Sequence, residues 1–411
     1  MRRRSLFGNP RPLASCCGLV ALVVLVAGRV AADDYPVGNR GTMWQDPYMI
    51  ASFRHWDEIY PVRTVPRAGP VFELPRAAEP IRLEGFQLDG KSYGLEDYFA
   101  RARTAGLLVL KDGVVVYERY RLGADAGSRF TSMSVAKSVV STLVGFAVAD
   151  GLIAGVDQPI TDYLPELEGT GYDGVPIKAV LQMSSGVAFS EDYDSPSSDF
   201  MRLWYDVVDY QKERLDDAVA KAKAGVAPFA QFNYKGIDTA ALGWLVARVT
   251  GKTLSDYLAE KLWGPLGMEA DAEWGVEDRR PGATEIAFCC LNATLRDYAR
   301  FGLFMAQKGN WQGRQLLPAA WIEEATHPDR PQVAPGKLYE DYALGYQYQW
   351  WTFPGSDGAF TAQGVNGQFI YVNPAERLVI AMTSAWPDYW DDGLETETYA
   401  LFAAIAAAAR P

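Results

Sequence analysis

The most constraining feature of this sequence is a long apolar segment that runs from Val139 to Ala149 and is followed by Asp150-Gly151. The segment is apolar on most faces of a helix, and a glycine comes directly after its end. This pattern predicts a buried helix with a C-terminal glycine cap. Such a helix needs other layers of structure around it, and a chain of 411 residues is long enough to supply them.

Ser134 and Lys137 lie on the first turn of this predicted helix. Residues three apart on a helix share one face, with β-carbons about 5–6 Å apart. A serine hydroxyl becomes a good nucleophile when a neighbouring base takes its proton, and a lysine serves as that base when its pKa is lowered. Burial and the positive end of the helix dipole both disfavour the charged amine. The pair is therefore a candidate nucleophile and base.

The same helix start offers the backbone N–H of Ser134 as half of an oxyanion hole. A Ser-x-x-Lys sequence is also expected by chance about once in a chain of this length and average composition. The four residues alone leave an accidental match open, so the surrounding sequence has to decide.

Strand patterns stand on both sides of this helix in the sequence. Two apolar runs within residues 106–120 are separated by Lys111-Asp112-Gly113, which predicts a β-hairpin with an Asp-Gly turn. After Pro335 the pattern changes to a period of two. Four more strands and a final helix are predicted there, at residues 342–351, 359–364, 368–372, 378–384 and 395–410.

Between these strand regions the pattern is helical, from about residue 151 to 309. Strands at both ends with helices between them predict an α/β (α+β) fold with one central sheet assembled from the N- and C-terminal segments. The sheet is flanked by helices, and a helical lobe is inserted at about 151–309. We divide the chain into a leader at 1–32, an N-terminal arm at 33–80 and one domain at 81–411.

Residues 1–32 have the features of an export signal. Three arginines at positions 2–4 precede an apolar run between residues 13 and 28, and Val30-Ala31-Ala32 provides small residues for cleavage. We expect an exported protein, periplasmic or secreted, without stable membrane insertion after cleavage. An uncleaved anchor remains the alternative, although the apolar run is short for a membrane span.

The composition argues against several partners and cofactors. The formal net charge of −12 does not suit a nucleic-acid partner. With two histidines in the chain and no Cys-x-x-Cys or His-Glu-x-x-His, we expect no metal site and no cofactor. Cys289 and Cys290 are expected to be buried thiols, because adjacent cysteines form a disulfide only with unusual backbone strain.

Two sets of short motifs occur in the chain, the first at 130–138, 181–186, 232–243, 263–268 and 364–368, and the second at 242–244, 293–297 and 383–387. The first set resembles the motifs of the serine β-lactamase and penicillin-binding-protein superfamily, and the resemblance covers roughly residues 106–387. The second set makes the sequence most similar, within that superfamily, to 6-aminohexanoate-dimer (nylon-oligomer) hydrolases and related carboxylesterases. The resemblance implies a β-lactamase-like fold.

The resemblance also implies a mechanism, which is hydrolysis through an acyl-enzyme. Ser134 would attack the substrate, Lys137 and Tyr234 would shuttle its proton, and water would release the acyl group. The backbone N–H groups of Ser134 and Val365 would complete an oxyanion hole. A core tyrosine bonded to backbone is the alternative for Tyr234, and Lys235 beside it could point to solvent.

Three further residues are implied as substrate contacts. In nylon-oligomer hydrolases a loop tyrosine contacts the scissile amide, and Tyr193 stands at a similar distance past the nucleophile. Gly364 and Trp386 are the other two. A solvated acidic turn is the alternative for Tyr193, and a core position is the alternative for Trp386. If the acidic loop around Tyr193 closes over the site, its carboxylates could attract a substrate amine.

Two positions depart from the pattern of the superfamily. Many relatives carry Lys-Thr-Gly, or a histidine before the glycine, where this chain has Ala362-Gln363-Gly364. No cation is therefore available there to hold a substrate carboxylate. Gly236 stands where relatives often have asparagine or serine.

The resemblance implies a serine hydrolase, and the departures move the expected small-molecule substrate away from β-lactams and towards linear amides or esters. Two alternatives remain. One is a β-lactamase or D-alanyl-D-alanine carboxypeptidase, and the other is a non-catalytic penicillin-recognising binding module.

Overall fold

The computed structural model describes residues 35–410. The export signal predicted at 1–32 lies outside the described residues. Within residues 35–410, no helix is both long enough and apolar enough to cross a membrane.

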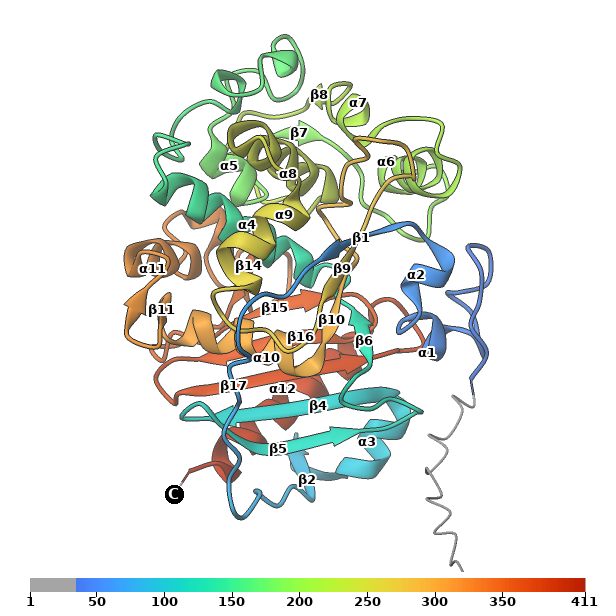
Figure 1. Ribbon diagram of the computed structural model, residues 1–411, viewed down its shortest axis with the longest axis vertical. Helices are drawn as coiled ribbons and strands as arrows, with labels where there is room; N and C mark the ends of the chain where they lie inside the picture. The colour runs from blue at the N-terminus through green and yellow to red at the C-terminus, as the bar shows by residue number, and fades with distance from the viewer. Residues whose placement is uncertain (1–34, 411) are drawn as a thin grey trace, which may run out of the picture. The chain divides into compact units, whose positions relative to one another are not determined.

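A seven-stranded antiparallel sheet forms the centre of the fold, and it joins the two ends of the chain (Figure 1). The two strands of the predicted hairpin pair with each other, and the first of them also pairs with the last strand of the chain. The strand order is β13 (Gly345–Gln347), β14 (Trp350–Thr352), β15 (Phe360–Gly364), β16 (Gln368–Asn373), β17 (Leu378–Ser384), β4 (Thr104–Lys111) and β5 (Val114–Tyr120). The predicted central antiparallel sheet is thereby confirmed.

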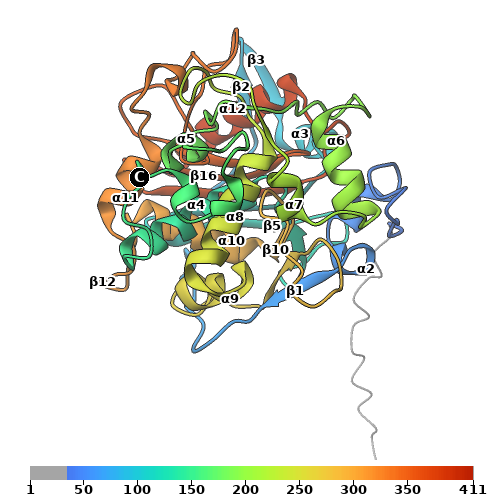
Figure 2. The same cartoon turned by 90° about the horizontal axis from the view of Figure 1, so that it is seen from above.

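Residues of β4 alternate between two hydrophobic layers, as the period of two requires. Leu107 and Val109 pack in the layer of α3 (Leu95–Arg101) and α12 (Asp392–Ala408). Leu108 and Leu110 pack in the opposite layer, which holds α4 (Val135–Ala149) and α10 (Leu295–Ala306). The sheet is thus covered by helices on both faces (Figure 2).

The predicted buried helix is α4, which lies between the sheet and the helices of the inserted segment (Figure 1). Every residue from Val135 through Ala147 is buried. The helix ends as predicted, because Gly151 adopts a left-handed φ of 72°. Leu152 N–H donates to Ala147 O at 2.9 Å, which closes a Schellman cap.

The segment from about 151 to 309 contains short strands as well as helices. Besides α10 and two 3₁₀ turns (Ile160–Asp162 and Pro165–Leu167), its helices are α5 (Ile177–Leu181), α6 (Asp199–Leu203), a π-helical turn (Trp204–Asp209), α7 (Leu215–Val219), α8 (Gly236–Thr250), α9 (Leu254–Leu258) and a second π-helical turn (Ala259–Trp263). Its strands are β7 (Val187–Ala188), β8 (Lys223–Ala224), β9 (Ala272–Gly275) and β10 (Leu291–Thr294). The sequence pattern predicted none of these four strands, which are too short to show a period of two.

A second, four-stranded sheet brings the N-terminal arm to the nucleophile. Its order is β1 (Val62–Val65), β9, β10 and β6 (Arg129–Thr131), and β6 ends three residues before Ser134. The N-terminal arm therefore carries secondary structure of its own. It contains α1 (Met49–Ser52), α2 (Trp56–Ile59) and β1.

The remaining elements complete the two faces of the molecule. Backbone hydrogen bonds of Pro75 and Ala77 to Val115 cover the edge strand β5. The outer elements are β2 (Gly85–Leu88), β3 (Lys91–Gly94), β11 (Asn310–Trp311), β12 (Arg314–Gln315) and α11 (Ala319–Thr326). The hydrogen bonds of Pro75 and Ala77 to β5 block unwanted strand pairing at that edge of the sheet.

The close approach of α4 to α11 gives a prediction about stability. A β-carbon on Gly145 would lie 2.3 Å from Nε1 of Trp321, whose ring is buried. Gly145→Ala should therefore lower the free energy of unfolding by about 1–3 kcal/mol through overpacking. Urea denaturation measures this change. Gly155→Ala is the matched control, because a β-carbon there meets no atom within 4 Å; equal midpoints for the two variants would contradict the prediction.

Candidate active site

Ser134 stands at the N-terminal cap of α4, but its side chain does not cap the helix. Serine at this position usually accepts a hydrogen bond from a helix N–H, but the Ser134 side chain makes no cap bond. Its Oγ instead accepts a hydrogen bond from Lys137 Nζ at 2.9 Å. The preceding Met133 has a left-handed φ of 45°, a costly conformation that places the serine at the mouth of the helix.

Lys137 is a buried amine held by two oxygen atoms. Its side chain is 2% exposed, and Nζ also donates to the backbone carbonyl of Phe288 at 2.9 Å. Burial lowers the pKa of Lys137 to about 8, while the negative charge of Glu191 acts in the opposite direction. At pH 7 about a tenth of the amine is therefore neutral, and this form is able to accept a proton from Ser134.

Tyr234 lies just before α8 with its ring against the lysine. Lys137 Nζ is 4.9 Å from the ring centroid, and the ring stacks on Trp351 at 5.6 Å. Burial raises the pKa of the Tyr234 phenol well above its usual value, Glu191 raises it further, and a hydrogen bond with the Ser134 side chain lowers it. The neutral phenol is the favoured form, so Tyr234 is suited to donate a proton.

Glu191 is the site residue that the sequence did not single out. Its Oε1 accepts from Tyr193 OH at 2.7 Å, and its Oε2 accepts a short hydrogen bond from the Gly236 backbone N–H. Burial raises the pKa of this carboxyl, and the charge of Lys137 lowers it. A β-carbon on Gly236 would lie 3.4 Å from Oε2, so the carboxylate is in van der Waals reach of this position.

The predicted oxyanion-hole residues lie together. Gly364 ends β15 directly against the nucleophile segment: a β-carbon there would lie 2.6 Å from Ser132 O and 3.0 Å from Ser134 N. Only glycine allows this approach. It brings Val365 to the cavity wall beside Ser134.

Two predicted positions differ in the structure. Trp386 does not line the site: it is 1% exposed, and its indole fills the space beside Gly367, where a β-carbon would lie 2.2 Å from Nε1. The neighbouring Tyr389 reaches the cavities in its place. Lys235 does not point to solvent, because its Nζ lies 3.4 Å from a carboxylate oxygen of Asp238 and the side chain is buried.

The expectation of two free thiols is wrong. Cys289 and Cys290 form a disulfide between adjacent residues. The backbone strain that such a pair requires is present, because Cys290 has a left-handed φ of 72°. Cys289 follows Phe288, whose carbonyl holds Lys137. Across residues 35–410, no group of three or more histidine, cysteine or acidic side chains is placed to hold a metal ion.

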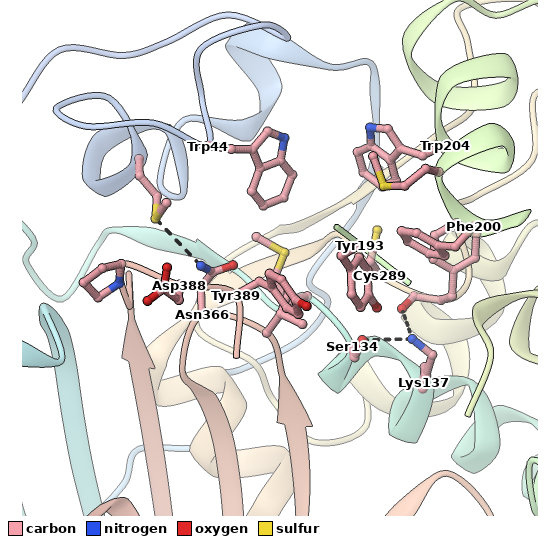
Figure 3. Close-up of a pocket in the computed structure, with 16 residues that line it drawn as sticks. Trp44, Ser134, Lys137, Tyr193, Phe200, Trp204, Cys289, Asn366, Asp388 and Tyr389 are labelled. Carbon is pink, nitrogen blue, oxygen red and sulfur yellow. Dashed lines mark hydrogen bonds between the residues drawn. The ribbon is translucent and has the colours of Figure 1, made fainter. Parts of the chain in front are cut away.

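Two cavities meet at Ser134. The first cavity, of about 310 Å³, is mostly apolar and is shown in Figure 3; its walls include Trp44, Met49, Phe200, Trp204, Phe288 and Cys289. The second cavity, of about 420 Å³, has walls that include Glu191, Asp192, Tyr234, Trp351, Gln363 and Trp390. Both are lined by Ser134, Tyr193, Val365 and Tyr389. Substrate thus has room on two sides of the nucleophile.

Comparison with known proteins agrees with this geometry. The family model described as Beta-lactamase matches residues 95–404. A 6-aminohexanoate-dimer hydrolase from Paenarthrobacter ureafaciens is 30% identical over 355 residues, which make up 84% of this chain and 88% of that protein. The chain therefore belongs to the β-lactamase family of serine hydrolases, and the predicted resemblance is confirmed.

Solved structures share the fold. A Bacillus anthracis protein that carries the provisional name 6-aminohexanoate-dimer hydrolase superposes with a TM-score of 0.80 at 24% identity, over 89% of this chain and 95% of its own. A family VIII carboxylesterase superposes with a TM-score of 0.55 at 18% identity, over 74% of this chain and 97% of its own. The fold therefore occurs in proteins with different names for their activity.

The position of Glu191 predicts how activity depends on pH. The kcat/KM for p-nitrophenyl butyrate should rise as Lys137 loses its proton, through a pKa of about 8. The negative charge of Glu191 raises the pKa of Lys137. In Glu191→Gln the rise should therefore move to lower pH. Initial rates measured across the pH range test this shift.

Asp192→Asn is the matched control for that experiment. Asp192 is the next residue in the loop and is exposed, so its replacement should leave the midpoint in place. A midpoint that stays fixed in Glu191→Gln, or moves to higher pH, would contradict the assigned interaction.

Proposed function

We propose that this protein hydrolyses linear amides or esters through an acyl-enzyme formed on Ser134. The observation that carries the proposal is the 2.9 Å hydrogen bond from the buried Lys137 Nζ to Ser134 Oγ, together with a Lys137 pKa of about 8. A buried, partly neutral amine in contact with a serine hydroxyl is the requirement for this kind of nucleophile.

Acylation begins when Ser134 Oγ attacks the substrate carbonyl carbon and Lys137 Nζ accepts the hydroxyl proton. The carbonyl oxygen becomes an oxyanion, which accepts hydrogen bonds from the backbone N–H groups of Ser134 and Val365. Collapse of this intermediate breaks the bond to the leaving nitrogen or oxygen. Tyr234 OH donates a proton to that atom and regains one from the Lys137 ammonium.

Deacylation repeats the same steps with water. A water molecule attacks the ester carbonyl of the acyl-enzyme while Lys137 Nζ accepts a proton from it. The bond to Ser134 Oγ breaks, the proton returns to the serine, and the carboxylic acid leaves. No cofactor or metal ion is needed for either half of the reaction.

The positions of the groups assign the two halves of the substrate. Tyr234 lines the second cavity and does not line the first. Since Tyr234 protonates the leaving group, that group belongs in the second cavity. The acyl group then occupies the first, mostly apolar cavity.

The charge of the second cavity supports this substrate class over the alternatives. Its charged lining residues are Glu191 and Asp192, and none of its lining residues is a cation. Gln363, in the motif where many relatives carry a cation, donates to Tyr399 OH at 2.6 Å instead. A substrate carboxylate near the scissile bond finds no partner there, which argues against β-lactams and D-alanyl-D-alanine peptides.

A direct test compares p-nitrophenyl butyrate, the linear 6-aminohexanoate dimer and nitrocefin as substrates. We expect turnover of the ester or the linear amide and little turnover of nitrocefin. Ser134→Ala should lower kcat by about 10³-fold or more, and Lys137→Ala by about 10²–10⁴-fold. Labelling by a fluorophosphonate probe should require Ser134; no labelling of the folded wild type would favour a non-catalytic binding module.

Tyr234→Phe separates the role of the phenol from that of the lysine. A p-nitrophenolate leaves without a proton, whereas an amine needs one, so the variant should lose about 10²-fold more activity on an amide than on the p-nitrophenyl ester. The ratio of the two kcat values measures this difference. An equal loss on both substrates would contradict the assignment of Tyr234 as the acid.

The acidic second cavity also predicts a preference for the charge of the leaving group. At low salt, butyrylcholine should be hydrolysed about two- to fivefold faster, in kcat/KM, than its neutral isostere 3,3-dimethylbutyl butyrate. Asp192→Asn should reduce this ratio, and so should added salt. Asp388→Asn is the matched control, because Asp388 lines the first cavity only. A ratio of one in the wild type would contradict the prediction.

A further inference from the structure

We propose that the N-terminal arm determines substrate specificity, and that Trp44 on this arm sets the length of the acyl chain that the first cavity accepts. The inference rests on the proposed function, because it concerns the acyl half of the same substrate. The chemical class it assigns is a short acyl chain without a distal carboxylate.

Residues of the arm form part of the cavity itself. Trp44 precedes α1, Met49 begins it, and both line the first cavity. In Figure 3 the indoles of Trp44 and Trp204 lie on the side of the cavity away from Ser134 and Lys137. An acyl chain that extends from Ser134 Oγ into this cavity therefore meets Trp44 and Trp204 at its far end.

The arm is fixed where it reaches the cavity. The ring of Trp44 makes edge-to-face contacts with Phe53, Trp56 and Trp204, at centroid distances of 5.6, 6.4 and 6.2 Å. Such aromatic contacts hold a side chain in a defined orientation. Trp44 is nevertheless 37% exposed, so one part of its ring stays available to a ligand.

Polar contacts tie the same segment to the body of the protein. The guanidinium of Arg103 makes a two-pronged ion pair with Asp46, at 2.6 and 2.7 Å. Phe53 O accepts from the N–H of Thr131 at 2.9 Å, and Thr131 stands three residues before the nucleophile. The arm is thus attached to the strand that leads into Ser134, so the cavity wall and the nucleophile keep a constant relative position.

The lining defines what this cavity can hold. Aromatic rings and methionine side chains dominate it, and its charged lining residues are Lys137 and Asp388. Lys137 is engaged by Ser134 and Phe288, and Asp388 would repel an anion. A volume of about 310 Å³ lies at the small end of ligand cavities. Short apolar acyl chains fit these properties better than long chains or dicarboxylic acids.

The experiment measures an acyl-chain profile with p-nitrophenyl esters from acetate to dodecanoate. Wild type should prefer short chains. Trp44→Ala should raise the decanoate-to-butyrate ratio of kcat/KM by about tenfold or more, and should change the acetate value little, because an acetyl group does not reach Trp44. Trp44→Leu is a milder second variant, which should shift the ratio in the same direction.

Trp390→Ala is the matched control. Trp390 is also a partly exposed tryptophan, but it lines the second cavity, so its loss should leave the acyl profile unchanged. The inference would be overturned if Trp44→Ala and Trp44→Leu still react with the fluorophosphonate probe but show the same acyl-chain profile as the wild type. Failure of the proposed function itself would look different, because the wild type would then lack Ser134-dependent labelling and ester hydrolysis.

Discussion

The burial of one lysine amine is the constraint on which the rest of this structure depends. Lys137 is useful as a base only while its ammonium is destabilised, and that requires apolar layers on every side of the start of α4. The central sheet supplies one layer and α8 with its neighbours supplies another. The amine is still not left without partners, since Ser134 Oγ and Phe288 O accept its hydrogen bonds. The fold thus lowers the pKa of Lys137 without leaving its buried amine short of hydrogen-bond partners.

The carboxyl group of Glu191 affects the pKa of both the proposed base and the proposed acid. Glu191 favours protonation of both of its neighbours, because its negative charge raises the pKa of Lys137 and that of Tyr234. The effect on the lysine is outweighed by burial, and the effect on the tyrosine adds to burial. The result is an amine whose pKa lies close to neutral pH beside a phenol that stays protonated. This is the pairing of base and acid that acyl transfer to water requires.

Local sequence predicted those features that depend on local geometry, and tertiary contacts decided the others. The helical spacing of Ser134 and Lys137 and the cap at Gly151 follow from neighbouring residues, and the central sheet follows from strand periodicity. The role of Glu191 does not, because it depends on a loop meeting Gly236 across the fold. The burial of Lys235 and of Trp386 likewise depends on distant partners. For Cys289 and Cys290, the sequence predicted that backbone strain would prevent a disulfide, whereas the structure contains both the disulfide and the left-handed φ of Cys290.

The pairing of β17 with β4 determines when the active site forms during synthesis and folding of the chain. Ser134 and Gly364 are far apart in the sequence and meet only when the last strands add to the first ones. Contacts of such high contact order form late, because the entropy of closing a long loop opposes them. A partly synthesised chain therefore exposes a serine and a lysine without an oxyanion hole. Hydrolytic competence should appear only after the whole chain has been made and folded, so a nascent chain has no active site with which to attack its surroundings.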